Sequence, residues 1–336
     1  MLRPGAYPTG WLPGVAMPDA NDELLTRVGD ALAGLTGSRD AALVLAVSGG
    51  PDSMAMLDIA RSCWAGSLYA TTVDHGLRPE SADEAAMVNA YCAAAGVAHA
   101  TLRPPVPITG SLQSAARAAR YALLNQHAND CGADFIVTAH HADDQLETML
   151  MRLARGSGVD GLSGVRSRNG RIIRPLLGCR KAELITYCER TRLRFVSDPS
   201  NDNMEFDRVR MRAALASFDA IDPLMAVRSA DALADAAEAL DWMADREAQT
   251  SIIADDDGVL LILTSYPPGL LRRLVQRCLE RVQPGIVPRG PQADRLIAAL
   301  HSGEQTMIGD VLCRPVREGL AWQFTAAPKR GGVQRR

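Results

Sequence analysis

The residues from Ser48 to Ser53 have types that could cradle a phosphate group. They read Ser-Gly-Gly-Pro-Asp-Ser and directly follow the apolar run Ala42 to Val47. Two adjacent glycines allow backbone N–H groups to converge on an anion, and a helix that begins there points its positive end at the same place. The two serines add hydroxyl groups. The sequence therefore predicts a phosphate-binding loop made of Ser48, Gly49, Gly50, Pro51, Asp52 and Ser53.

Asp52 is the unusual member of this loop. A carboxylate next to a bound phosphate is repelled unless a cation lies between them, so we predict a Mg²⁺ ion at Asp52 and a pyrophosphate leaving group. A Walker-type loop is excluded, because it needs Gly-Lys followed by Ser or Thr, and the chain's two lysines are Lys181 and Lys329. The alternative to a phosphate site is a plain tight turn between a strand and a helix.

A second group of reactive side chains begins at His140, where the chain reads HHADDQLETMLMRLARGSG. On a helix, His140, Asp144 and Glu147 share one side. Two histidines and two carboxylates at a strand-to-helix turn could bind a metal, act as acid and base, or orient a substrate amine. Helix capping with a solvated ion pair is the structural alternative. For His141 alone, the structural and the functional interpretation are equally compatible with the sequence.

The elements that must position these two groups alternate between strand and helix. Apolar runs predict strands at residues 42–47, 68–73, 98–102 and 135–138, and helical patterns separate them at residues 54–63, 83–95 and 113–129. This alternation is typical of an α/β fold with a doubly wound, mainly parallel sheet, which binds ligands at the carboxyl ends of its strands. Ser48, the pair Asp74 and His75, and the pair His140 and His141 all follow such ends.

The composition is that of a soluble globular protein. The 336 residues permit two or three domains, and 47% are hydrophobic and 22% charged. Pro and Gly interrupt the opening segment, which therefore does not resemble a signal peptide, and no run approaches the roughly 20 apolar residues of a membrane span. We expect a cytoplasmic protein without a membrane partner. The seven cysteines include no CxxC pair, which argues against a zinc or iron–sulfur site.

Composition also suggests the domain boundaries. We expect an N-terminal extension, partly disordered, over residues 1–38, an α/β domain over 39–217, a smaller α-rich domain over 218–326 and a basic tail over 327–336. The smaller domain begins where the chain becomes rich in Ala and acidic residues, and it contains a strand pattern at 258–263 and helical patterns at 268–282 and 292–301. The segment 150–216 holds 14 Lys and Arg against 7 Asp and Glu, which favours contact with phosphate or RNA over a merely solvated surface.

The loop Ser48–Ser53 resembles the PP-loop of the N-type ATP pyrophosphatases, which cleave ATP between its α and β phosphates to adenylate an oxygen. Further motifs follow in order: VDHGLR at 73–78, ARAARY with Arg117 and Arg120, the group from His140, RPLL from Arg174, and SDPSNDNMEFDRVRMR from Ser197 to Arg212. Together, over residues 43–212, this set resembles the tRNA(Ile)-lysidine synthetase family. The chain is similar to the short members of that family, which lack a further C-terminal domain.

This resemblance implies a ligase that uses ATP and Mg²⁺ to join L-lysine to the wobble cytidine of isoleucine tRNA with a CAU anticodon. It implies that the loop binds the ATP phosphates, that Asp52 binds Mg²⁺ or orients lysine, that His140 and Asp144 are the catalytic pair, and that Arg120 and Arg212 lie at the reaction centre. The full set of expected catalytic residues is Asp52, Arg120, His140, Asp144 and Arg212.

The chain departs from the family pattern at the last motif. The family usually has Asn after the first arginine of this motif, whereas Arg208 is followed here by Val209, so Arg210 competes with Arg212 for the role at the reaction centre. Two other functions remain open: a PP-loop tRNA thiolase, which the missing cysteine pair disfavours, and an ATP-binding sensor without catalysis. The sequence also leaves the oligomeric state open, with a homodimer as one option.

Overall fold

The computed structural model describes residues 20–74, 76, 81–105, 112–196, 207–215, 220–316 and 319–327. Four parts of the predicted motifs lie outside the described residues: His75, residues 77–78 of the VDHGLR motif, residues 197–206 before α8, and the basic tail from residue 328. The chain divides into two compact units, one within residues 1–147 and 166–227 and the other within residues 148–165 and 228–336. Each unit is described by itself.

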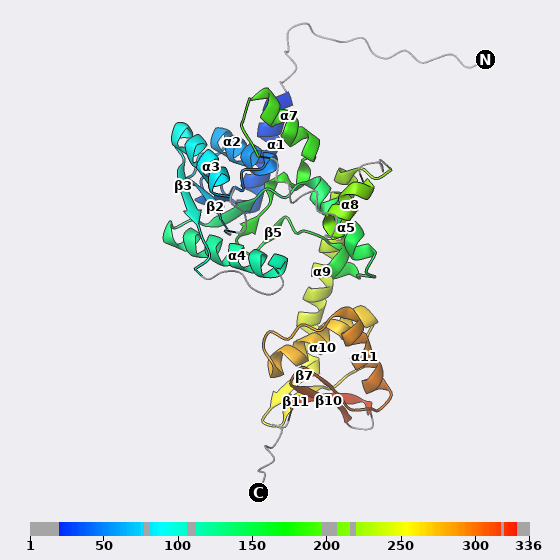
Figure 1. Ribbon diagram of the computed structural model, residues 1–336. Helices are drawn as coiled ribbons and strands as arrows, with labels where there is room; N and C mark the ends of the chain where they lie inside the picture. Colours follow the sequence, from blue (N-terminus) through cyan, green and yellow to red (C-terminus); the bar gives the residue numbers. More distant parts are fainter. Residues whose placement is uncertain are drawn as a thin grey trace, which may run out of the picture. The chain divides into compact units, whose positions relative to one another are not determined.

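The first unit is built on a six-stranded sheet (Figure 1). The strands follow the order β3-β2-β1-β4-β6-β5, and all neighbours are parallel except the short final pair β5 and β6. This arrangement confirms the predicted α/β fold with a mainly parallel sheet. The strands are β1 (Leu43–Ala46), β2 (Leu68–Val73), β3 (Ala98–Leu102), β4 (Phe135–Thr138), β5 (Arg168–Asn169) and β6 (Ile172–Ile173).

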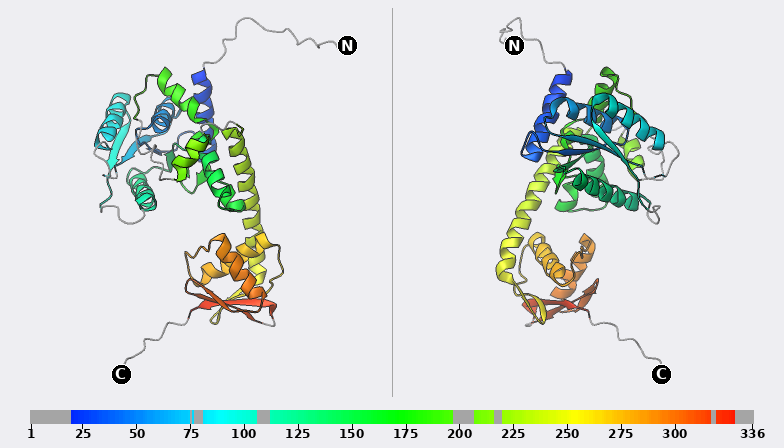
Figure 2. Two further views of the ribbon diagram at one scale, coloured as in Figure 1. Left: turned by 45° about the vertical axis from the view of Figure 1, so that its right-hand side comes forward. Right: turned by 90° about the vertical axis from the view of Figure 1, so that its left-hand side faces the viewer.

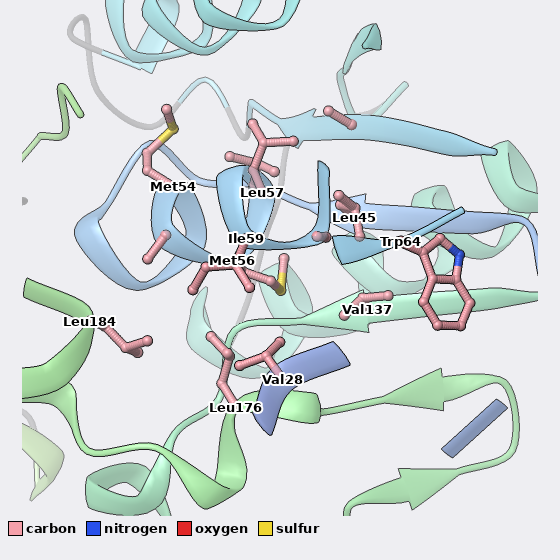
Figure 3. Packing of buried hydrophobic residues seen from close by; sticks show 14 of the residues in the cluster. Val28, Leu45, Met54, Met56, Leu57, Ile59, Trp64, Val137, Leu176 and Leu184 are labelled. Atoms are coloured by element: carbon pink, nitrogen blue, oxygen red, sulfur yellow. The ribbon is translucent and has the colours of Figure 1, made fainter. Parts of the chain in front are cut away.

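Alternating side chains of the central strands enter two separate cores. Leu43 and Leu45 of β1 join the core that also contains α2, while Val44 between them packs on the other side against Leu124 of α4. Helices therefore cover both faces of the sheet, as apolar residues on both sides of a parallel strand require (Figure 2). Figure 3 shows the larger core, where Leu57 and the other labelled side chains gather around β1.

The helices of the first unit agree closely with the predicted patterns, with one difference near the N-terminus. Residues 20–36, assigned to an extension by the sequence pattern, form helix α1 (Ala20–Thr36), whose Leu24, Val28 and Leu32 are buried in the larger core. The other helices are α2 (Pro51–Cys63), α3 (Ser81–Ala95), α4 (Leu112–Asp130), α5 (Ala142–Leu153), η1 (Pro175–Gly178), α7 (Lys181–Arg190) and α8 (Asp207–Leu215).

The second unit combines helices with a five-stranded antiparallel sheet, ordered β7-β8-β11-β10-β9. Its core lies between this sheet and helices α10 and α11, and includes the fully buried Trp322 and Phe324. The sequence pattern predicts only the strand near residue 258. Of the others, β9 has three residues and β10 contains Pro315, which is unusual inside a strand. The elements are α6 (Val159–Leu162), α9 (Pro223–Ser251), β7 (Ile252–Asp255), β8 (Gly258–Leu261), α10 (Pro268–Val282), α11 (Gly290–His301), β9 (Thr306–Ile308), β10 (Val311–Val316) and β11 (Ala321–Ala326).

The parallel strands of the first unit bring the predicted reactive residues to one edge of the sheet. β1 ends just before Ser48, and β4 ends just before His140. Because β1 and β4 are adjacent and in register from Leu43 opposite Phe135, their carboxyl ends lie side by side. Within the described residues, no helix is both long enough and apolar enough to span a membrane.

Candidate active site

The phosphate loop is a tight turn that its own serines close. The backbone N–H of Ser48 donates to Ser53 Oγ at 3.1 Å, and the Ser53 hydroxyl donates to the carbonyl of Gly50 at 3.0 Å. Ser53 is buried, whereas Ser48 is exposed. Helix α2 begins at Pro51 with Gly50 as its N-cap, so no capping side chain occupies the space in front of the first N–H groups. The Ser53 hydroxyl thus holds the loop, and the Ser48 hydroxyl lies 3.2 Å from it.

Gly49 has a backbone conformation that only glycine adopts without strain. Its φ is +87°, and a Cβ here would contact the Met87 and Glu84 side chains at 3.4 and 3.7 Å. The Gly49 carbonyl accepts a hydrogen bond from the Val196 N–H at 2.9 Å. The loop is therefore fixed between α3 and the chain that follows α7.

Asp52 and His141 join the phosphate loop to the start of α5. His141 Nε2 lies 3.5 Å from Asp52 Oδ2 and 3.5 Å from Asp144 Oδ2, and its Nδ1 lies 3.5 Å from Asp143 Oδ2. Asp143 also accepts the backbone N–H of Lys181 at 2.8 Å, at the start of α7. The ring is only 3% exposed. One buried imidazole therefore contacts carboxylates from two different helices.

The carboxylates around His141 decide its charge. Burial disfavours the imidazolium, but hydrogen bonds to Asp143 and Asp52 and the negative charges of Asp144 and Asp52 outweigh it and raise the pKa of His141 to about 10. Burial also disfavours the charged form of Asp144 and so acts to raise its pKa. The positive charge of His141 outweighs this effect and holds the pKa of Asp144 below its ordinary value. At neutral pH the site therefore contains an imidazolium next to the ionised carboxylates of Asp143 and Asp144.

His140 has the opposite protonation state. Its Nδ1 lies 2.9 Å from the Thr138 hydroxyl. Burial, together with the positive charges of Arg174, Arg117 and Arg208, lowers the pKa of His140 to about 4 against the attraction of Asp144. His140 is therefore neutral at physiological pH and can accept a proton, while its neighbour His141 cannot.

Helix α8 adds two arginines to the carboxylates of α5. Arg212 Nε donates to Glu147 Oε1 at 2.6 Å, and its Nη2 lies 3.4 Å from Asp144 Oδ1. Arg208 Nε donates to Glu147 Oε2 at 3.1 Å. Arg210 instead forms an exposed ion pair with Asp207 on the same helix. Of the two arginines left open by the sequence, the structure brings Arg212 to Asp144.

No hydrogen bond or ion pair joins the other residues of the sequence motifs, Arg120, Arg117 and Asp74, to this cluster within the described part of the chain. Arg120 is exposed on α4 and makes no hydrogen bond or ion pair with any other residue that the structure describes. Arg117, one turn earlier, stacks on the Tyr121 ring at 5.1 Å. Asp74 is buried after β2, where it accepts the Gly76 N–H and the Arg103 guanidinium, each at 2.9 Å.

Five residues of the cluster were not among the expected catalytic residues: His141, Asp143, Glu147, Arg174 and Arg208. The sequence places His141 and Glu147 in the group of reactive side chains around His140 but gives neither a catalytic role, and no pattern distinguishes Asp143, Arg174 or Arg208 from surface charges. The signal that could have identified Glu147 is its position seven residues after His140, on the same side of a helix as Asp144. Arg174 gives no such signal, because burial of a lone arginine after a strand cannot be read from sequence.

Known proteins resemble this chain over most of its length. The family model of the PP-loop domain matches residues 22–218. The tRNA(Ile)-lysidine synthase of Novosphingobium aromaticivorans is 42% identical over 297 residues, which cover 85% of this chain and 89% of that protein. The tRNA(Ile)-lysidine synthase of Zymomonas mobilis is 38% identical over 297 residues, which cover 86% and 89%.

A solved structure supports the fold. The U34-tRNA thiolase NcsA from Methanococcus maripaludis superposes with a TM-score of 0.52 at 16% identity, over 64% of this chain and 80% of that one. Likeness at this level of identity concerns the architecture only. The PP-loop domain implies that the protein uses ATP. With near full-length similarity to two synthases and the predicted loop and fold in place, the chain belongs to the tRNA(Ile)-lysidine synthase family of PP-loop proteins.

Proposed function

We propose that this protein ligates lysine to C2 of the wobble cytidine in the CAU anticodon of isoleucine tRNA. The cytosine O2 attacks the α-phosphate of ATP, the α–β bond breaks and pyrophosphate leaves. The lysine ε-amine, after losing a proton, then attacks C2, and the C2–O bond breaks to release AMP. A single-stranded anticodon base is accessible to such a site, because it can leave the stack without opening a duplex.

One observation carries this proposal: His141 contacts both Asp52 of the phosphate loop and Asp144 of the α5 cluster. Holding a nucleotide requires the loop alone. The additional carboxylates and arginines beside it supply what a second, cationic substrate and a developing negative charge require. This is why ligation is favoured over an ATP-binding sensor.

The residues present fit a Mg²⁺ ion in part. Asp52 Oδ1 is buried and has no hydrogen-bond partner among the described residues, so one carboxylate oxygen is available to a cation. No group of three or more His, Cys, Asp or Glu side chains in the described ranges could hold a metal by itself. Mg²⁺ commonly takes one or two carboxylates together with substrate phosphates, which suits a single Asp52 ligand. Bound there, the ion would neutralise charge on the phosphates.

The roles of the other residues follow from their charge states. His140 is neutral at physiological pH, and we assign it the relay of the proton that the lysine ammonium must lose. Asp144 orients that amine. Arg212 and Arg120 balance negative charge on the reacting phosphate. The loop N–H groups and Ser48 hold the phosphates of ATP.

The main enzymatic alternative is a tRNA thiolase with the same loop. It is disfavoured because the sequence contains no CxxC pair, and the seven cysteines are free thiols, five of them buried. Burial raises the pKa of several of these thiols, among them Cys188 and Cys278, away from the thiolate form that sulfur transfer needs.

The test is incorporation of radiolabelled lysine into a CAU-anticodon isoleucine tRNA transcript in the presence of Mg-ATP, with AMP and pyrophosphate measured in parallel. We expect label in this tRNA and none when the wobble cytidine is replaced. AMP release without lysine transfer would redirect the assignment to another acceptor or to a sulfur donor. Intact ATP after long incubation would favour the sensor.

The proposal includes the cellular setting. We place the reaction in the cytoplasm, where tRNA and ATP are available, with no membrane partner. The sequence leaves the oligomeric state open, with a homodimer as one option. Light scattering with and without tRNA would determine it.

A further inference from the structure

Arg174 lies at the carboxyl end of a strand next to the one that carries His140. β4 and β6 are parallel, with Ile136 opposite Ile172 and Val137 opposite Ile173. One residue further along each strand are Thr138 and Arg174. Both strands thus deliver a polar residue to the same edge of the sheet, where the Thr138 hydroxyl contacts His140.

Arg174 is a buried cation without an anionic partner. The residue is 5% exposed. Its Nη1 donates to the Arg166 carbonyl at 2.5 Å, but its buried Nε has no hydrogen-bond partner, and no carboxylate within the described ranges forms an ion pair with it. Leaving a buried guanidinium uncompensated is costly, so an arginine in this position needs an explanation.

The acidic residues of the site are already engaged by other cations. Glu147 accepts hydrogen bonds from Arg208 and Arg212, and Asp144 lies against Arg212 and His141. Arg174 instead acts on the neutral His140, whose pKa is lowered by burial and then by the positive charge of Arg174. Within the described residues, no acid of the site is therefore left to compensate the charge of Arg174.

We propose that Arg174 is a phosphate-binding residue of this site, whose anionic partner is supplied by a substrate. The chemistry suits a phosphate, because the planar guanidinium presents parallel N–H groups that match two phosphate oxygens and gives up its hydration readily. The source of the phosphate rests on the proposed function: it is either the nucleotide phosphate that becomes AMP or a backbone phosphate of the RNA.

The experiment measures binding without turnover. The variants are Arg174→Met, which keeps bulk but removes the charge, and Arg174→Lys, which keeps the charge but removes the fork. The matched control is Arg171→Met, because Arg171 lies beside the same strand at its other end and donates to Asn129 and Ala133. The probes are AMP, inorganic pyrophosphate and the tRNA transcript, each titrated by calorimetry, together with the melting temperature of each free protein.

We expect Arg174→Met to weaken binding of one class of probe about 10- to 100-fold, the size of a lost charge-assisted pair. We also expect its melting temperature to be equal to or above that of the wild type, because removing an unpaired buried charge relieves its cost. Weaker AMP or pyrophosphate binding would identify the nucleotide phosphate as the partner of Arg174. Weaker tRNA binding would identify a backbone phosphate of the RNA as that partner. Arg174→Lys should retain part of the affinity.

Wild-type affinity for all three probes in Arg174→Met would overturn the inference. So would a lower melting temperature with affinities no worse than those of Arg171→Met, because Arg174 would then only support the Arg166 carbonyl. If Arg174→Met does not fold, the same comparison is made with Arg174→Lys, where a loss of less than twofold is the negative result. None of these assays needs lysine transfer. If the protein failed to make lysidine, the proposed function would be rejected, and the phosphate-binding role of Arg174 would still be decided by the binding measurements.

Discussion

The two units of the molecule use the same chemistry, arginine paired with carboxylate between helices, in opposite environments. In the first unit, Arg212 pairs with Glu147, whose side chain is 6% exposed. In the second, Arg273 of α10 pairs with Asp241 of α9, whose side chain is 53% exposed, and Arg277 pairs with Asp245, which is 70% exposed. The acids, more than the arginines, differ in their access to water.

Because of this difference in exposure, losing one partner of an ion pair should cost little stability in the second unit and much more in the first. A solvent-exposed ion pair contributes about 0 to 1 kcal/mol, because water screens the attraction. A buried pair is costly to assemble, and removing one partner leaves a charge that water cannot reach. The exposed pairs of the second unit therefore only help to hold α9 against α10. The buried pairs of the first unit are costly to assemble, and a role of their charges in the reaction would explain why they are present.

The largest effect is expected from Glu147→Gln. This change leaves Arg208 and Arg212 facing a neutral amide, so we expect the free energy of unfolding to fall by about 3 kcal/mol. Turnover should fall at least about 100-fold, because both arginines lose their fixed position near Asp144. Chemical denaturation and the lysine-incorporation assay measure the two effects.

Asp207→Asn is the control for this variant, because Asp207 pairs with Arg210 on the same helix, α8, but is 53% exposed. It should change the unfolding free energy by less than about 0.5 kcal/mol. Equal effects of Glu147→Gln and Asp207→Asn would remove the distinction between buried and exposed pairs.

Much of the first unit could be predicted from sequence because its signals are local. Parallel strands buried on both faces give unbroken apolar runs, so the strands near Leu43 and Phe135 were placed to within a residue or two. The phosphate loop follows from the order of small residues after β1. The carboxyl-end rule then brings His140 to the same edge. The family and the fold are confirmed.

What could not be predicted depends on contacts between distant segments. His140 and His141 have opposite protonation states because burial, with a smaller effect of Arg174, keeps His140 neutral, whereas Asp143, Asp52 and Asp144 keep His141 charged. The burial and the approach of Asp52 and Arg174 arise only in the folded chain. The packing of α1 into the core depends on tertiary burial of Leu24 and its neighbours, because a short amphipathic helix near a terminus resembles any flexible extension. The catalytic roles of Asp52, Arg120, His140, Asp144 and Arg212 stay predictions.

The second largest effect should separate two arginines of α8. Arg212→Ala should lower kcat about 100-fold while changing tRNA affinity less than threefold, because Arg212 lies against Asp144 and Glu147 in the cluster. Arg210→Ala, which breaks an exposed pair with Asp207, should leave kcat within threefold. Equal losses of kcat and tRNA affinity in Arg212→Ala would make Arg212 an ordinary phosphate anchor.

A smaller effect concerns pH and the buried histidine of the first unit. The folded-state pKa of His140 is lowered to about 4 from an ordinary value of 6.5, so between these values the unfolded chain binds a proton that the folded protein does not. Stability must therefore fall as pH decreases from 6.5 towards 4. Relative to His140→Gln, the wild type should lose about 1 to 2 kcal/mol of unfolding free energy between pH 7 and pH 5. Parallel stability curves of the two proteins would contradict the buried, neutral state of His140.

The smallest effect is expected in the second unit. Asp241 accepts from Arg273 at 3.0 Å and lies 3.6 Å from Arg277, so Asp241→Asn removes the charge common to both pairs. Each arginine keeps another acid, since Arg273 also pairs with Asp160 at 2.6 Å and Arg277 with Asp245 at 2.7 Å. We expect a loss of less than about 1 kcal/mol, which 0.5 M salt should halve, because screening already weakens an exposed pair. A salt-independent loss as large as that of Glu147→Gln would show that these pairs are protected from water, and the contrast between the two units would then rest on function alone.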